Sequence, residues 1–248
     1  MAGSKNLRVV VFCLDFETVR FLKPIKHYRA DKVIMLYKAK RKAYREFKKE
    51  IERQMDKGVK YEAIETTIWD FGPCLKELLV ILKNEKKEGN HVYVNLTGTP
   101  AYSAAAMVAC MMFDGTPFFA PVKEFTNDSS IFFLNARPVG VSSDVKEPLE
   151  LPTFHLEAPN VDVIRGLHVW KERKEKGLLT TDTKVIEDFE KEGLMEKVHD
   201  NRGRVTQKAK MQYRRRFLEK WLSEKWVEPK ERGKYELTDY GKVVVEVF

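Results

Sequence analysis

Two short apolar runs constrain the fold of this chain more than any other feature of its sequence. Leu7–Leu14 and Lys32–Tyr37 have the length of strands but lack the polar–apolar alternation of a half-exposed strand. Strands that are apolar on both faces are typical of parallel sheets, which helices cover on both sides. The sequence therefore predicts a parallel sheet buried between helices.

Further strands and helices alternate with these runs. We expect strands at 59–68, 91–96 and 116–122, helices at 18–29, 40–57, 70–87 and 101–112, and an antiparallel hairpin over Glu124–Asn135. Strands joined by crossover helices indicate an α/β fold with a mostly parallel, Rossmann-like sheet flanked by helices.

A change of composition divides the chain of 248 residues. Four prolines and Gly140 punctuate 137–160, and the segment has little periodicity, which is typical of a linker. A chain of this length is expected to hold roughly two domains of about 150 residues each. We predict a first domain at 1–136, a linker at 137–160 and a second domain at 161–248.

The fourth strand ends in a polar turn that leads directly into a helix. Such a junction lies at the carboxyl edge of an open α/β sheet, where ligands bind. Backbone N–H groups, hydroxyls and an amide near a helix N-terminus suit a phosphate, a sugar hydroxyl or a base edge. The expected ligand-binding residues of this turn are Asn95, Thr97, Gly98, Thr99 and Pro100. The alternative is that Asn95 and Thr97 only cap the helix and brace the turn.

A second polar loop follows the first strand and contains Asp15, Phe16, Glu17 and Arg20. In the common strand order 3-2-1-4-5-6, strands one and four are neighbours, so both loops meet at one crevice. The two carboxylates suit ribose hydroxyls or an adenine amino group, and Arg20 suits a phosphate. The turn and the loop carry no nucleophile–base pair, so recognition is expected rather than catalysis.

The segment 161–248 has a different pattern. Helices are expected at 161–176, 184–192 and 206–225, followed by a two-stranded ribbon at 226–238 and a closing helix from Asp239. On the third helix, Tyr213, Phe217 and Trp221 recur every four residues and form a stripe that faces the core. Three helices followed by a ribbon are the plan of a winged helix-turn-helix domain.

Positive charge concentrates in this second domain. Residues 202–234 hold 12 Lys or Arg against 4 Asp or Glu, whereas the rest of the chain is close to neutral. Such a basic helix and ribbon can contact the phosphates and bases of DNA. The expected DNA-binding residues are Lys208, Gln212, Arg215 and Arg216 on the helix and Lys230, Arg232 and Lys234 on the ribbon. The alternative is a winged helix that serves only dimerisation or RNA contact.

The compartment is predicted from cysteines and hydropathy. Cys13, Cys74 and Cys110 lie far apart in apolar segments and without the spacing of a metal site, as expected for reduced thiols of a cytoplasmic protein. No apolar run approaches the roughly 20 residues that span a bilayer. We therefore expect no membrane segment and no bound metal.

Asp15-Phe16-Glu17 and Asn95-Leu96-Thr97-Gly98-Thr99-Pro100 resemble the two ligand-binding motifs of the CARF domain, the CRISPR-associated Rossmann fold. The ending Gly233-Lys234-Tyr235-Glu236-Leu237-Thr238-Asp239-Tyr240-Gly241 resembles the winged helix-turn-helix of archaeal and bacterial regulators. The order of the two domains is that of CARF transcriptional regulators linked to CRISPR loci. Pro100 departs from the CARF pattern, because a lysine or another polar residue is common there.

This resemblance implies a homodimeric transcriptional regulator that binds double-stranded DNA. Its effector would be a cyclic oligoadenylate, a cyclic nucleotide second messenger, and it would need no cofactor. Two alternatives stay open: a ring nuclease or other nucleotide-processing enzyme whose winged helix is a scaffold, and an assembly or RNA-binding protein with a vestigial cleft. Pro100 and the lack of histidine in either motif disfavour the enzyme.

Overall fold

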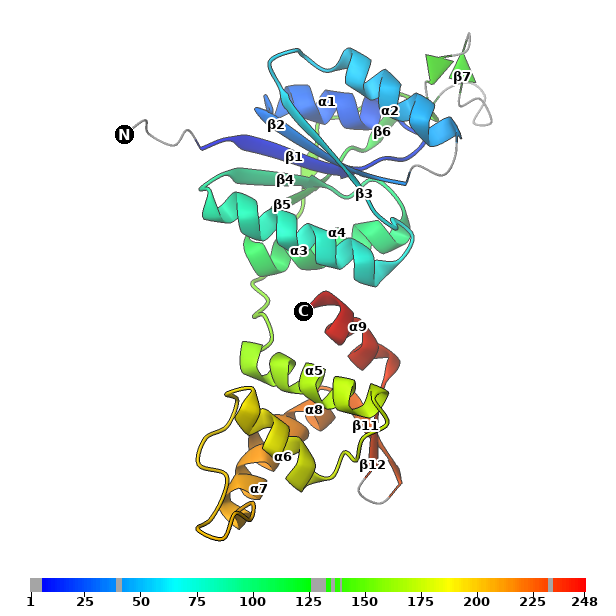
Figure 1. Ribbon diagram of the computed structural model, residues 1–248. Coiled ribbons are helices and arrows are strands. Elements are labelled where there is room, and N and C mark those ends of the chain that lie inside the picture. The colour runs from blue at the N-terminus through cyan, green and yellow to red at the C-terminus, as the bar shows by residue number, and fades with distance from the viewer. Residues whose placement is uncertain (1–5, 39–41, 126–132, 135–136, 139, 232–233) are drawn as a thin grey trace. The chain divides into compact units, whose positions relative to one another are not determined.

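The computed structural model describes residues 6–38, 42–125, 133–134, 137–138, 140–231 and 234–248 (Figure 1). The chain divides into two compact units, with the boundary between Glu157 and Ala158. No helix in these described ranges combines the length and the apolar character that a membrane crossing requires.

The first unit is built on a six-stranded sheet in the order β10-β5-β4-β1-β2-β3. Its strands are β1 (Arg8–Cys13), β2 (Lys32–Tyr37), β3 (Lys60–Glu65), β4 (His91–Asn95), β5 (Thr116–Phe119) and β10 (Leu149–Glu150). The first five pair in parallel, and only β10 runs antiparallel to its neighbour. The predicted parallel sheet is confirmed, and so is the pairing of β1 with β4.

Four helices flank this sheet. They are α1 (Val19–His27), α2 (Lys42–Gln54), α3 (Phe71–Lys87) and α4 (Pro100–Phe113). The first two lie on one side of the sheet and the other two on the opposite side (Figure 1). This covering explains why Val9–Cys13 and Val33–Leu36 are almost completely buried, as their unbroken apolar character predicts. The first unit therefore has a Rossmann-like α/β architecture.

The segment that the sequence assigns to a linker belongs largely to the first unit. β9 (Ser142–Val145) pairs with β6 (Val122–Phe125), β10 extends the main sheet, and β8 (Arg137–Pro138) pairs with β7 (Phe133–Leu134). The linker predicted over 137–160 therefore begins too early, because prolines are tolerated in edge strands as well as in linkers.

The prediction of a hairpin over Glu124–Asn135 is wrong for its first strand, because β6 pairs with β9 and not with the segment that ends at Asn135. Its expected turn, 127–130, lies outside the described residues.

The second unit contains helices followed by a hairpin and a last helix. Its elements are α5 (Val161–Glu175), α6 (Asp182–Lys191), α7 (Gln207–Tyr213), η1 (Arg214–Leu218), α8 (Glu219–Ser223), β11 (Val227–Glu231), β12 (Lys234–Leu237) and α9 (Asp239–Val247). α7, η1 and α8 follow one another without a break and form the predicted long helix, with a π turn in its middle. Tyr213, Phe217 and Trp221 are buried, as the stripe predicts.

In the core of the second unit, α5 contacts the long helix, and α9 packs against the backbone of Trp226. The Trp221 indole N–H donates to the carbonyl oxygen of Val163 at 3.0 Å. The Thr238 hydroxyl caps α9 by accepting from the backbone N–H of Gly241 at 2.9 Å. A Cβ atom at Gly241 would overlap the carbonyl oxygen of Trp226. Only glycine therefore fits at this point of α9.

Candidate functional site

The turn between β4 and α4 is held rigidly by its own side chains. Thr99 is the N-cap of α4, and its Oγ1 accepts from the backbone N–H of Tyr102 at 3.3 Å while donating to the carbonyl oxygen of Ile68. The Ser103 hydroxyl donates to the carbonyl oxygen of Leu96 at 2.7 Å. Pro100 occupies the first turn of the helix, where a missing N–H costs nothing. The predicted strand–turn–helix junction is therefore present.

Asn95 is completely buried and connects the two polar loops. Its Nδ2 donates to the carbonyl oxygen of Arg20 at 2.9 Å, and its Oδ1 accepts from the backbone N–H of Thr97 at 2.9 Å. Both ends of the amide are thus used within the protein. The side chain braces the junction, which is the alternative that the sequence left open for this residue.

Thr97 differs from its neighbours in the turn. Its side chain is buried, with the residue 4% exposed, yet Oγ1 has no hydrogen-bond partner among the described residues. Leaving a buried polar group unpaired costs about 1–3 kcal/mol, so such a group needs an explanation. In the same turn, Gly98 packs so tightly that a Cβ atom there would lie 3.2 Å from Cβ of Cys13, the last residue of β1. The β4–α4 turn and the end of β1 are therefore in direct contact.

The loop after β1 is partly engaged in packing. Asp15 is half-buried, and its Oδ1 accepts from the backbone N–H of Phe16 at 2.8 Å. The Phe16 ring packs against that of Tyr44, with 4.6 Å between ring centroids. Glu17 is buried, and its carboxylate accepts from the hydroxyl and the backbone N–H of Ser142 at 2.9 and 3.2 Å.

Burial raises the pKa of the Glu17 carboxyl, although the hydrogen bonds from Ser142 and the nearby Arg20 charge oppose the shift. Burial likewise lowers the pKa of the half-buried Arg20 guanidinium, while Glu17 and Asp15 oppose that shift. Arg20 also donates from Nε to the carbonyl oxygen of Ala120 at 3.0 Å. The structure thus gathers a cation and two carboxylates beside the β4–α4 turn.

Ser142 is the residue of this region that the sequence did not reveal. It is 1% exposed and supplies both hydrogen bonds to Glu17. It lies in β9, in the segment interpreted as a linker, and no motif surrounds it. A serine in a proline-rich stretch gives no signal that it fixes a carboxylate 125 residues away.

The predicted DNA-binding residues of the long helix are not equivalent. Lys208, Gln212 and Arg215 are exposed. Arg216 instead forms an ion pair with Asp162 at the start of α5 and donates from Nη1 to the carbonyl oxygen of Leu194 at 3.3 Å. Arg216 therefore helps to hold the second unit together.

The hairpin residues are also engaged. Lys230 pairs with Glu236 at 2.7 Å, and Lys234 pairs with Glu231 at 2.6 Å. Arg232, the third hairpin residue predicted to bind DNA, lies outside the described residues. Each described hairpin lysine thus has a carboxylate beside it.

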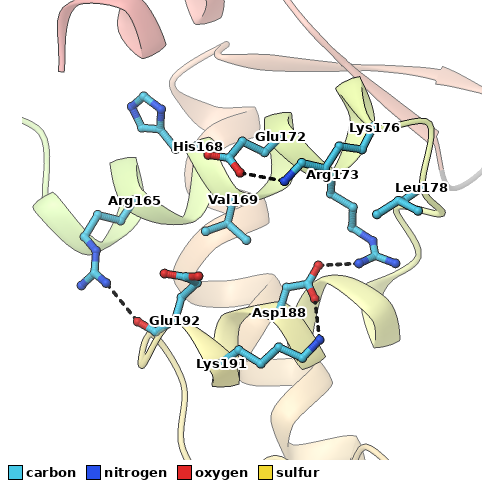
Figure 2. Close-up of a pocket in the computed structure, with 10 residues that line it drawn as sticks. All are labelled: Arg165, His168, Val169, Glu172, Arg173, Lys176, Leu178, Asp188, Lys191 and Glu192. Atoms are coloured by element: carbon cyan, nitrogen blue, oxygen red, sulfur yellow. Dashed lines mark hydrogen bonds and ion pairs between the residues drawn. The ribbon is translucent and has the colours of Figure 1, made fainter.

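A pocket of about 550 Å³ lies in the second unit, between α5 and α6. Figure 2 shows the residues that line it. Arg165 donates to the carbonyl oxygen of Glu192 at 2.9 Å, and Arg173 pairs with Asp188. The pocket is lined by Arg165, His168, Val169, Glu172, Arg173, Lys176, Leu178, Asp188, Lys191 and Glu192. Lys176 pairs in turn with Glu172, and Lys191 with Asp188. Arg173, Lys176 and Lys191 are thus paired with carboxylates of the pocket's own lining.

No cluster of three or more His, Cys, Asp or Glu side chains that could hold a metal ion occurs in the part of the chain that the structure describes. Cys13, Cys74 and Cys110 are all free and buried.

Residues 8–124 match the sequence-family model described as "HFX_2341_N:-like, N-terminal". No curated protein matches the chain.

Two of the solved structures that match the chain are Can2 and VC1899. Can2 from Sulfobacillus thermosulfidooxidans, in complex with cyclic tetra-adenylate, has 12% sequence identity and a TM-score of 0.39, over 96% of this chain and 63% of that chain. The protein VC1899 from Vibrio cholerae has the same identity and TM-score, over 96% of this chain and 64% of that chain. The chain therefore spans less than two thirds of the length of either structure.

Proposed function

We propose that the first unit binds a cyclic oligoadenylate or a related nucleotide at the β4–α4 turn. We further propose that the second unit is a winged helix-turn-helix domain that binds double-stranded DNA, so that a homodimer of the chain acts as a ligand-responsive transcriptional regulator. The observation that carries the proposal is the buried hydroxyl of Thr97 in the β4–α4 turn, which has no hydrogen-bond partner among the described residues. The resemblance of the two loops to the CARF motifs supports the class of ligand.

The geometry separates residues that would contact a ligand from residues that hold the site. Asn95, Glu17 and Thr99 have protein partners, so they would fix the loops rather than bind. Thr97 would donate its hydroxyl proton to a phosphate or ribose oxygen, and Arg20 would supply a positive charge. The half-buried Asp15 would accept from a ribose hydroxyl or an adenine amino group.

The DNA-binding part of the proposal depends on the order of elements in the second unit. Three helical segments, α5, α6 and the long helix, precede the β11–β12 hairpin, and the long helix carries exposed Lys208, Gln212 and Arg215. A basic helix of this kind can enter the major groove of DNA. The basic character of residues 202–234 supports binding to a polyanion.

Replacing Thr97 by valine tests the ligand site. Thr97→Val keeps the shape of the side chain and removes a hydroxyl that has no partner in the described part of the chain, so the unliganded protein should lose no stability. Binding should weaken roughly tenfold to a hundredfold, since a hydrogen bond to a charged group contributes about 1.5–3 kcal/mol. Calorimetric titration with cyclic tri-, tetra- and hexa-adenylate, combined with thermal unfolding, measures both quantities.

Thr99→Val is the matched control, because the same chemical change removes a helix cap that the structure uses. It should lower the free energy of unfolding by about 1 kcal/mol. If Thr97→Val destabilises the protein as Thr99→Val does and leaves nucleotide binding unchanged, Thr97 does not contact the ligand.

Ligand-responsive regulation also requires coupling between the two units. Titrating the cyclic oligoadenylate with and without a saturating DNA duplex should give dissociation constants that differ by a factor of about 5 to 150, corresponding to about 1–3 kcal/mol. Because linkage is reciprocal, the ligand should shift duplex affinity by the same factor. Equal constants in both titrations would show two independent binding units and refute the sensor.

A further inference from the structure

Positive charge in the second unit gathers on one continuous stretch of chain. Residues 197–216 contain eight Lys or Arg and a single acid, Asp200. Arg214 is held by Asp182 at 2.8 Å and Arg216 by Asp162. The other six cations form no ion pair within the described residues, and all but the half-buried Lys210 are exposed. We call these six the turn–helix patch: Lys197, Arg202, Arg204, Lys208, Lys210 and Arg215.

Part of the turn–helix patch is presented on a fixed backbone. One carboxylate oxygen of Asp200 accepts from the backbone N–H groups of Arg202 and Arg204, each at 2.9 Å. The backbone N–H of Asp200 donates to the carbonyl oxygen of Arg204 at 2.9 Å, and Gly203 takes the positive φ of 71° that the turn needs. The two arginines thus extend from a closed turn immediately before α7. Because this turn is already ordered, binding a partner through the two arginines would cost the chain little backbone entropy.

The β11–β12 hairpin differs in charge. Residues 227–237 contain three basic and three acidic residues, so the formal charge of the hairpin is zero. Its Lys230 and Lys234 lie within ion-pair distance of Glu236 and Glu231. Exposed pairs of this kind are weak and could open. The two glutamates would nevertheless remain beside any phosphate that the lysines reached, and they would repel it.

The patch suits a nucleic acid better than a lipid surface. A helix that binds membranes inserts an apolar face between lipid headgroups. The apolar stripe of the long helix, Tyr213, Phe217 and Trp221, is instead buried in the core. The exposed side of the helix carries Lys208, Gln212 and Arg215, which can contact phosphates and base edges.

We infer that double-stranded DNA contacts the turn at 200–205 and the first half of the long helix, and that the hairpin makes no net electrostatic contribution. This inference rests on the proposed DNA-binding function and deepens it. It adds Arg202 and Arg204 as phosphate-contacting residues and removes Lys230 and Lys234 from that role. The long helix keeps Lys208 and Arg215.

Two double variants of the full chain with equal net charge test the inference. Arg202→Ala/Arg204→Ala and Lys230→Ala/Lys234→Ala each remove two positive charges, and all four side chains are exposed. Affinity for a mixed-sequence DNA duplex is measured by fluorescence anisotropy over a series of salt concentrations. The turn variant should lower the log–log salt slope by about two and weaken binding at least tenfold. The hairpin variant should leave the salt slope unchanged and weaken binding less than the turn variant does, because its lysines contact no phosphate.

The possible outcomes distinguish this inference from the function on which it rests. If the unaltered chain binds the duplex and the hairpin variant loses affinity while the turn variant does not, the inference is wrong and DNA binding stands. Equal losses in both variants would also overturn it, because net charge alone would then govern binding. If the unaltered chain does not bind duplex DNA, the proposed function fails and the inference fails with it. Thermal unfolding of each variant confirms that the second unit stays folded.

Discussion

Gly241→Ala is expected to unfold the second unit or to destabilise it by about 3 kcal/mol or more. The added Cβ atom would overlap the Trp226 carbonyl oxygen, which is backbone and cannot rotate away as a side chain could. Relief requires α9 to move, and Val244 and Val245 would then leave the core that they share with Trp226. The change is the addition of one methyl group.

Denaturant unfolding followed by tryptophan fluorescence measures the effect. Trp170, Trp221 and Trp226 lie in the second unit and Trp69 in the first, so the signal reports mainly on the second unit. Gly58→Ala in the first unit is the control, because no atom lies within 4 Å of a Cβ there, and its unfolding is followed by circular dichroism, which reports on both units. It should change the free energy of unfolding by no more than about 0.5 kcal/mol. An unchanged midpoint for Gly241→Ala would mean that α9 does not pack at Trp226 as described.

Asn95→Ala is expected to lower the unfolding free energy of the first unit by about 2–6 kcal/mol. The substitution would leave the backbone N–H of Thr97 and the carbonyl oxygen of Arg20 without the partners that Asn95 provides. Each buried group left unpaired costs about 1–3 kcal/mol. The β4–α4 turn would also lose its connection to α1, so ligand binding should fall as a consequence of the lost geometry.

Asn84→Ala is a suitable control for this variant. Asn84 is exposed on α3, where alanine is the better helix former, so stability should stay equal or rise slightly. Circular dichroism during thermal unfolding compares the two variants. If both unfold at the same temperature, the turn does not depend on Asn95, and the side chain would again be a candidate for direct ligand contact.

Much of the fold follows from local sequence patterns. The apolar runs of β1 and β2 predict central parallel strands, because only a sheet covered on both faces buries them completely. The four-residue recurrence of Tyr213, Phe217 and Trp221 predicts the buried face of the long helix. In both cases, residues that are close in sequence are sufficient to predict which side chains are buried. No contact with a distant part of the chain changes that outcome.

The parts that could not be predicted depend on distant partners. Arg216 looks like any exposed arginine until α5 brings Asp162, which is 54 residues away in sequence, next to it. Ser142 has no local signature and acquires its role only when Glu17 is buried against β9. The role of Asn95 is difficult to predict for a different reason. An asparagine that binds a ligand and one that only braces the turn give the same sequence pattern at the end of a strand.

The short strand β10 determines where the first unit can be separated from the rest of the chain. A fragment ending at residue 136 would lose β9 and β10, leave the edge of β5 unpaired and strip Glu17 of both hydrogen bonds from Ser142. Unpaired sheet edges recruit other strands and promote aggregation. The shortest fragment that could be fused to another domain and still fold therefore extends to Glu157. The proline-rich stretch resembles a linker in sequence, but its strands β9 and β10 complete the fold of the first unit.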